Sequence, residues 1–205
     1  MSLHSARSSG ASTPSTGSPV EPSVGSADVS SVTSATAPEL PVAGVYLLPM
    51  VSAAMLDKLQ LKATNLLVAA QHSAGLRLTF FRERQFRLSR LTRGDTARGE
   101  NRARFFSDEI SNTRLYLHAL RTTTLDEHLA VLVLDRNDEL LDAVQSIARD
   151  NPSLECTRLG RAELSAQLGI SEETLGVSPD AIYLHLLGLK APDANLAPAG
   201  VTAGF

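Results

Sequence analysis

The sequence predicts a mixed α/β domain behind a tail rich in serine, threonine and proline. Two observations predict this fold class. Short apolar runs typical of strands alternate with segments that have the three- to four-residue period of helices. Three strand-like runs follow one another closely between residues 65 and 91, and two more flank a helical segment between residues 129 and 157. The first group predicts an antiparallel three-stranded meander and the second a βαβ unit.

Composition narrows the class of protein. Of the 205 residues, 43% are hydrophobic and 20% are charged, which is enough for one sizeable core. The net charge of -3 and an isoelectric point near 5.9 argue against binding nucleic acid or an anionic membrane through the overall field. The only cysteine, Cys156, excludes an intrachain disulfide and fits a reducing compartment.

A cytoplasmic location is expected from two features of the sequence. The N-terminal residues lack the basic cluster and apolar region of a secretory signal. The longest nearly apolar run, residues 43–55, is shorter than the roughly 20 residues that a membrane-spanning helix needs. No transmembrane segment is therefore predicted.

Three parts are predicted along the chain. More than half of residues 1–40 are Ser, Thr, Pro or Gly, and none is aromatic, so this segment cannot bury enough apolar surface to fold. We expect a disordered tail that serves either as a plain extension or as a partner-docking arm. The folded domain is expected at residues 41–190 and a flexible C-terminal tail at residues 191–205.

The domain is expected to open with a strand and a helix. Residues 42–48 form an apolar run closed by Pro49, which favours a short strand. Ser52 can cap a helix that extends to Leu59.

The meander is expected next. Leu76, Leu78 and Phe80 alternate with the residues between them, which is the period of a half-buried strand. The connection at residues 83–84 is so short that the strands on either side should pair antiparallel as a hairpin. The three strands are placed at residues 65–70, 76–81 and 85–91, with a turn at residues 71–75.

The second half is expected to hold a long helix and the βαβ unit. A polar, glycine-containing loop at residues 94–102 leads into the helix at residues 103–121, where Phe106, Ile110 and Leu117 lie on one face. The βαβ unit comprises a buried strand at residues 129–134, a helix at 139–149 and a strand at 154–157. Further helices are placed at residues 161–168 and 178–187.

No catalytic residue is predicted. The chain contains no GxGxxG, Walker A, HExxH or GxSxG motif. Its five histidines are scattered and its single cysteine has no CxxC partner, so no metal site is expected. Cys156 falls in a predicted strand, where a small buried hydrophobe is favoured over a nucleophile.

Asp135 is a candidate ligand because it directly follows a predicted parallel strand. Ligand sites of α/β proteins lie beyond the carboxyl ends of such strands. Asn137 or Asp138 would equally cap the following helix, and a strand-to-helix turn needs a cap whether or not it binds a ligand.

Arginines are concentrated between residues 77 and 104, a segment that contains nine arginines and only three acidic residues. Such a cluster can bind phosphates, lie on a solvated sheet face, or pair with an acidic protein partner. The last two are favoured, because Phe80, Phe81 and Phe86 are expected in the core and not as stacking platforms for bases. The predicted partner-binding residues are Arg77, Arg82, Arg84, Arg87 and Arg90.

Several stretches together resemble a known family. Residues 42–49 (VAGVYLLP), 66–81 (LLVAAQHSAGLRLTFF) and 86–92 (FRLSRLT) look like the second half of the actin-like cytoplasmic proteins of bacterial type IV pilus assembly, the PilM class. That class is related to the cytoplasmic domain of the type II secretion L-component. Residues 108–114 (DEISNTR) resemble part of its long helix, and residues 181–198 resemble its final helix and exit.

The resemblance implies a partial actin-like, ribonuclease H-like domain with a degenerate nucleotide site. It places that site at Gln71, His72, Ser73, Gly75 and Asp135. ATP-binding relatives carry an Asp-X-Gly type phosphate turn in the first strand of the meander, and residues 69–75 contain no acidic residue. The glycine pair expected near the base is replaced by residues 135–137, and no first actin-like lobe precedes residue 41.

The expected function is therefore a non-catalytic interaction or scaffold protein without a cofactor. The resemblance implies protein partners in a pilus or secretion platform and a cytoplasmic location, peripheral at the inner membrane through those partners. The arginine face or the apolar helix at residues 183–189 would dock another component or a second copy. Two alternatives stay open: an actin-like ATPase that uses ATP and magnesium, and a nucleic-acid binder acting through the arginines of residues 82–104.

Overall fold

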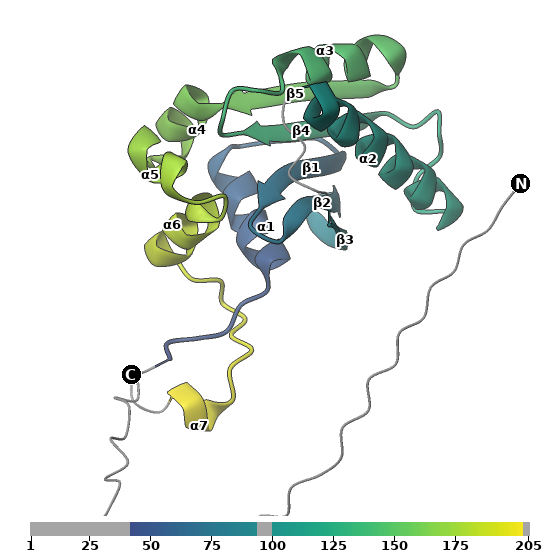
Figure 1. Cartoon of the computed structure of the whole chain (residues 1–205). Coiled ribbons are helices and arrows are strands. Elements are labelled where there is room, and N and C mark those ends of the chain that lie inside the picture. The colour runs from purple at the N-terminus through teal and green to yellow at the C-terminus, as the bar shows by residue number, and fades with distance from the viewer. Residues whose placement is uncertain (1–41, 94–99, 203–205) are drawn as a thin grey trace, which may run out of the picture. The chain divides into compact units, whose positions relative to one another are not determined.

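A five-stranded mixed sheet forms the centre of the computed structural model, which describes residues 42–93 and 100–202. The strand order is β3-β2-β1-β4-β5 (Figure 1). Strands β1, β2 and β3 form an antiparallel meander, whereas β4 is parallel to β1 and β5 is parallel to β4. The predicted mixed α/β class, with its meander and βαβ unit, is confirmed. The strands are β1 (Asn65–His72), β2 (Gly75–Arg82), β3 (Gln85–Thr92), β4 (Leu129–Asp135) and β5 (Leu154–Gly160).

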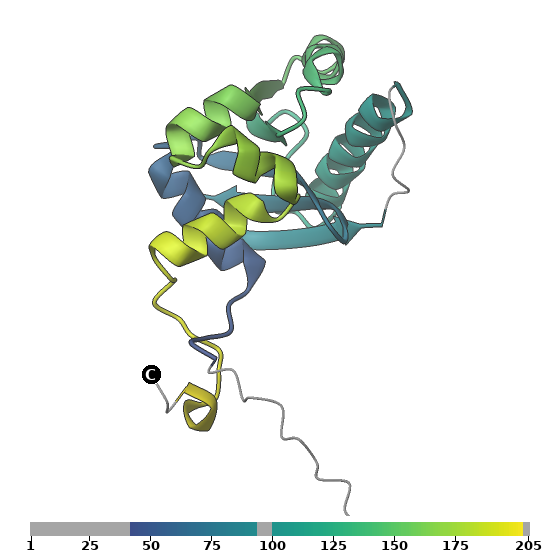
Figure 2. The same cartoon turned by 60° about the vertical axis from the view of Figure 1, so that its left-hand side comes forward.

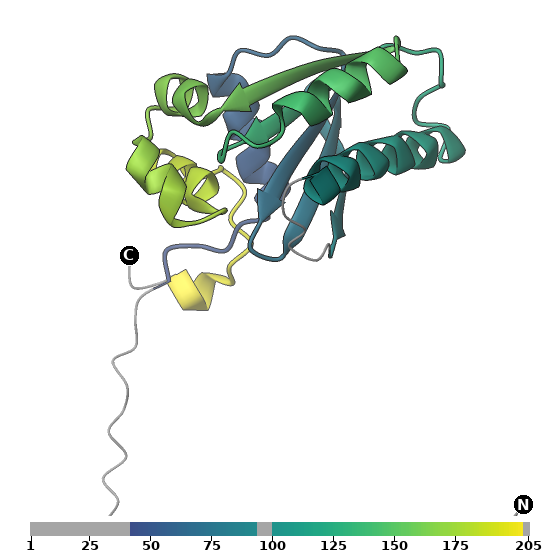
Figure 3. The same cartoon turned by 45° about the horizontal axis from the view of Figure 1, so that its top comes forward.

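Helices cover both faces of the sheet, as Figures 2 and 3 show. One face packs against α2 (Glu100–Ala119) and α3 (Leu141–Asp150). The other face packs against four helices: α1 (Leu48–Lys58), α4 (Arg161–Leu168), α5 (Glu172–Val177) and α6 (Ala181–Leu189). A short helix, α7 (Ala199–Thr202), lies at the end of the described chain.

The sheet therefore separates two apolar cores. Successive side chains of a strand point to opposite faces, so Phe80 packs in the core beneath α2 and Phe81 in the core beneath α1. Both rings are fully buried. The prediction of a half-buried strand at residues 76–81 is wrong, because α1 and α6 cover the face that was expected to meet solvent.

Tight turns join the strands of the meander. Glu83 and Arg84 both have positive φ, +51° and +62°, as a two-residue hairpin turn requires. The turn expected at residues 71–75 is narrower, because β1 continues to His72 and β2 starts at Gly75. Gly75 has φ +134°, and a Cβ there would lie 2.4 Å from the carbonyl oxygen of Thr92.

The strand predicted at residues 42–48 is absent. Residues 42–47 have no regular secondary structure, and α1 begins at Leu48 with Pro49 in its first turn. Proline is tolerated there because the first amides of a helix have no intrahelical acceptor, so Pro49 starts the helix and does not end a strand.

The C-terminal segment, which was expected to be flexible, is attached to residues 43–45. Asn195 donates from its side chain to the Ala43 carbonyl at 3.2 Å and accepts from the Val45 amide at 3.0 Å. The Leu196 amide donates to the Val45 carbonyl at 2.9 Å. We call this pairing of segments 150 residues apart the Asn195 clasp.

Other boundaries differ modestly from expectation. Helix α2 starts at Glu100, β5 extends to Gly160, and α5 was not predicted. Ser171 caps α5 by accepting a hydrogen bond from the Thr174 amide at 3.1 Å. The predicted tail at residues 1–40 and most of the predicted loop at 94–102 lie outside the described residues. Within the described ranges, no helix is both long enough and apolar enough to cross a bilayer.

Candidate functional site

The carboxyl ends of β1 and β4 lie side by side, because Ala70 pairs in parallel register with Leu134. This is the switch point of the sheet, where the chain turns from the meander on one side to the βαβ unit on the other. His72 ends β1 and Asp135 ends β4. The structure thus brings together the two parts of the predicted nucleotide-site remnant.

His72 and Ser73 both bind Asp180, the residue that precedes α6. The Nδ1 atom of His72 lies 2.7 Å from one carboxylate oxygen of Asp180, and the Ser73 hydroxyl donates to the other at 2.5 Å. The His72 ring is 4% exposed and contacts the ring of Tyr183, with 4.6 Å between centroids. These contacts hold the start of α6 against the end of β1.

This group of side chains is not arranged as a catalytic triad. In a triad, histidine lies between serine and aspartate so that it can accept the serine proton. Here Asp180 lies between Ser73 and His72, and the Nε2 atom of His72 is buried without a hydrogen-bond partner among the described residues. The arrangement is suited to positioning α6.

Burial lowers the pKa of His72 below its usual range. The Asp180 carboxylate opposes this shift through its hydrogen bond and charge, and the nearby charge of Arg77 adds to it. The folded state therefore favours the neutral imidazole.

The lowered pKa of His72 should make the free energy of unfolding depend on pH. Because the folded pKa of His72 lies below the unfolded value, its contribution to the free energy of unfolding is complete above about pH 6.5 and is lost as pH falls through the folded pKa. Urea unfolding at pH 7.5 and pH 5 should show a loss of stability that His72→Gln reduces and His118→Gln, at an exposed site, leaves unchanged. If the His72→Gln protein lost as much stability between pH 7.5 and pH 5 as the wild type, the assignment of this pH dependence to His72 would be contradicted.

The Asp180 carboxylate titrates in a separate range. Burial raises its pKa, but the hydrogen bonds from Ser73 and His72 outweigh that effect and lower it. Its contribution to stability is therefore present above about pH 4 and is lost only at more acidic pH.

Asp135 is buried, and both of its carboxylate oxygens accept hydrogen bonds from within the fold. Its carboxylate accepts from the Glu139 amide at 3.1 Å, the Leu140 amide at 2.8 Å and the Arg158 guanidinium at 2.9 Å. It therefore supports the turn that leads into α3. Neither Asn137 nor Asp138 caps that helix, contrary to the capping alternative, and Asp138 instead accepts from the Arg161 amide at the start of α4.

The other remnant residues have local roles. The side-chain amide of Gln71 donates to the His72 carbonyl at 3.1 Å, and Gly75 provides the positive φ at the start of β2. Arg136, next to Asp135, donates to the Leu175 carbonyl at 3.1 Å and thereby joins the switch point to α5. Burial lowers the pKa of Arg136, and the nearby charges of Arg102 and Arg161 add to that effect.

The predicted arginine face is not one surface. Arg77 and Arg90 project from opposite faces of the meander, since their strand partners are Leu91 and Leu78 in adjacent registers. Most of these side chains also have partners within the chain. Arg77 donates to Ser89, and Arg82 donates to the Thr122 carbonyl and to Glu127. Arg84 donates to the Leu61 carbonyl and to Asp57, and Arg90 to Thr113 and Glu109. Arg87 donates to Gln85.

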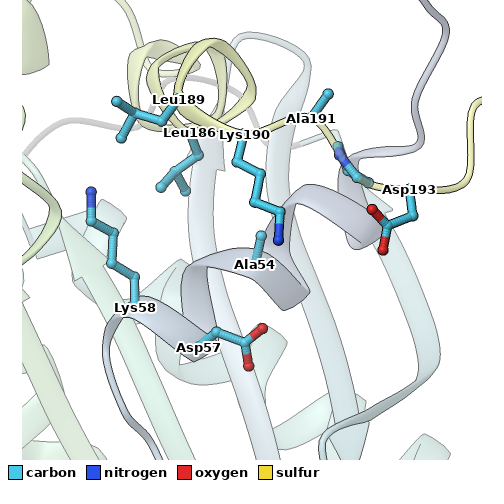
Figure 4. A pocket seen from close by; sticks show the side chains of 9 residues that line it. Ala54, Asp57, Lys58, Leu186, Leu189, Lys190, Ala191 and Asp193 are labelled. Atoms are coloured by element: carbon cyan, nitrogen blue, oxygen red, sulfur yellow. The ribbon is translucent and has the colours of Figure 1, made fainter.

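A groove lies between α1 and α6, the apolar helix that was predicted as a docking element (Figure 4). Its volume is about 580 Å³. Figure 4 shows the Lys190 side chain extending from the end of α6 toward Ala54 of α1. The lining residues are Ala54, Asp57, Lys58, Leu186, Leu189, Lys190, Ala191, Pro192 and Asp193.

Helix α6 exposes apolar side chains at two places, Leu184 on its outward side and Leu189 at the groove. Leu186 packs in the core, but Leu184 is 65% exposed and Leu189 is 59% exposed. A helix that is apolar all round is typical of a buried position. The groove at the C-terminal end of α6 is therefore the strongest candidate docking site, which we call the α6 surface: Leu189, Lys190 and Asp193.

Cys156 lies in β5, partly buried against the core beneath α3. Burial raises the pKa of its thiol to about 11, so the reactive thiolate is scarce at neutral pH. This agrees with a packing role.

Sequence reasoning missed Asp180, Lys190 and Asp193. Asp180 lies 107 residues from Ser73, and no sequence pattern links the two. Lys190 and Asp193 follow the apolar helix that was singled out as a docking element, and that proximity was the available signal.

No protein-family model matches this sequence, and no curated protein matches it.

Proposed function

We propose that this chain is a non-catalytic interaction or scaffold protein, similar to the actin-like cytoplasmic component of type IV pilus or type II secretion assembly. The observation that carries the proposal is the α6 surface. Leu189 of the apolar helix α6 is 59% exposed beside a groove lined by Leu186 and Ala54, which leaves an apolar docking face on the described domain.

The state of the switch point supports a non-catalytic role. A magnesium-bound nucleotide needs free carboxylate oxygens and backbone amides that face its phosphates. Asp135 already accepts three hydrogen bonds, and Asp180 already binds His72 and Ser73. A nucleotide at this edge would have to displace the contacts that hold α3 and α6.

The order of elements supports the resemblance to the actin-like family. A meander, a long helix, a βαβ unit and an apolar final helix follow one another as the resemblance implies. The assignment to a pilus or secretion platform, and to the cytoplasmic side of the inner membrane, rests on that resemblance.

Affinity capture from the native host tests this function. The full chain should recover an identified component of a pilus or secretion machine. Leu189→Asp should lose that component, because a carboxylate would be placed in the apolar docking face. Leu115→Asp is the matched control: Leu115 is an exposed leucine of α2 on the opposite face of the sheet. Recovery of no envelope-machinery component, or equal recovery by both variants, would contradict the proposal.

A thermal shift with magnesium and ATP tests the absence of a nucleotide function. A ligand at a hundred times its Kd adds about 2.7 kcal/mol to the free energy of unfolding. We expect no change in the Tm of the full chain. A clear rise in Tm would instead favour the ATPase alternative.

A further inference from the structure

We propose that the α6 surface binds a second copy of this chain, in a two-fold symmetric dimer. This inference rests on the proposed function and names the partner of its docking face. Two observations carry it: the apolar face of α6, and a pair of opposite charges beside it.

The charges available to a partner are few and specific. Lys58 donates to the Leu168 carbonyl at 2.6 Å, and Asp57 is paired with Arg84. Lys190 and Asp193 also line the groove, and neither forms an ion pair with another of the described residues. A partner must therefore offer one negative and one positive group close together beside an apolar patch.

A second copy offers this combination. In a two-fold interface the same patch is used twice, so if residue i contacts residue j, then j contacts i. Lys190 of one copy would meet Asp193 of the other, and the reciprocal pair would form on the other side of the axis. Leu189 of the two copies, 59% exposed in one chain, would pack between these pairs and lose its exposure to water.

Self-association through the β3 edge of the sheet is disfavoured. Strand β3 is an edge strand, but it carries Arg87 and Arg90 and no acidic residue, and its pairing is irregular opposite Phe80 and Phe81. Two such strands would bring arginines together, and an irregular edge pairs poorly. The α6 surface, which carries both signs of charge, has no such conflict.

Sedimentation velocity of the full chain over a concentration series is the first measurement. The wild-type chain should shift from monomer to dimer as concentration rises. Leu189→Asp should remain monomeric, whereas Leu115→Asp should dimerise like the wild type. A wild-type chain that stays monomeric throughout the series would overturn the inference.

Exchange of the two charges tests the reciprocal pairing. Lys190→Asp places two carboxylates opposite two carboxylates, and Asp193→Lys places two ammonium groups opposite two ammonium groups. Each variant alone should dimerise more weakly, with a Kd raised on the order of tenfold. An equimolar mixture of the two, and the double exchange in one chain, should both recover wild-type association.

The matched control is Lys62→Asp, a charge reversal at an exposed lysine outside the groove, which should leave the Kd unchanged. Failure of the mixture to recover association, with each single variant impaired, would overturn the reciprocal pairing.

The outcomes separate this inference from the proposed function. A monomeric chain that still captures a machine component through Leu189 would refute the dimer and leave the proposed function standing. A dimer with the expected charge behaviour that captures no such component would establish the dimer and refute the assignment to the machine.

Discussion

Asp135→Ala is expected to lower the free energy of unfolding by about 3–5 kcal/mol. The Asp135 side chain is 1% exposed, and its carboxylate joins the end of β4 to two backbone amides and to Arg158 of β5. Its removal leaves the buried Leu140 amide without its acceptor and takes one of two carboxylates from Arg158. The first loss leaves a polar group without a partner in a place that water reaches poorly, and the second leaves Arg158 paired with Asp138 alone.

Urea unfolding followed by circular dichroism measures this effect. Asp142→Ala is the matched control, because Asp142 is an exposed carboxylate in the first turn of α3 and should cost less than about 1 kcal/mol. Asp135→Asn keeps the shape of the side chain and one acceptor oxygen, so it should fall between the two. If Asp135→Ala proved as stable as Asp142→Ala, the structural role of this carboxylate would be refuted and a ligand role would regain support.

Gly75→Ala is expected to lower the free energy of unfolding by about 2–4 kcal/mol. The resemblance placed Gly75 in the nucleotide site, but the structure gives it a steric role. Its φ of +134° is rarely adopted by residues with a side chain, and a Cβ would lie 2.4 Å from the Thr92 carbonyl oxygen of β3. Relief of that clash would require β2 and β3 to separate at the end of the sheet.

Gly176→Ala provides the comparison for this prediction. Gly176 lies in α5, and a Cβ there would meet no atom within 4 Å. Alanine should raise stability there by about 0.5–1 kcal/mol, because it favours the helix and restricts the unfolded chain. Thermal unfolding of both variants should give shifts of opposite sign, and a Gly75→Ala protein as stable as the wild type would contradict the geometry of this turn.

Local patterns explain which elements could be predicted from the sequence. The uninterrupted apolar run of β4 indicated a strand covered on both sides, and the two-residue connection at Glu83 indicated a hairpin. Pro49 was misread because a proline between apolar residues fits the end of a strand as well as the first turn of a helix. Packing decided between the two, and packing is not visible in a local window.

Long-range contacts explain why the candidate site was predicted only in part. The position of Asp135 at a strand end followed from the predicted βαβ unit, whereas His72 was predicted in a turn and entered the candidate site only through the resemblance. Asp180, however, reaches His72 across 108 residues, and Arg158 reaches Asp135 across 23. The predicted arginine cluster dispersed for the same reason: neighbours in sequence alternate between the two faces of a strand, and their partners come from other elements.

The Asn195 clasp determines how the domain would bear mechanical load. It joins residues 43–45 to residues 195–196 by three hydrogen bonds, on either side of almost the whole described domain. A pulling force applied at residues 42 and 198 would be carried first by these bonds. The strands of the sheet would bear no tension until the clasp opened. Under such a force the three hydrogen bonds between the two short end segments would break before the core began to unfold.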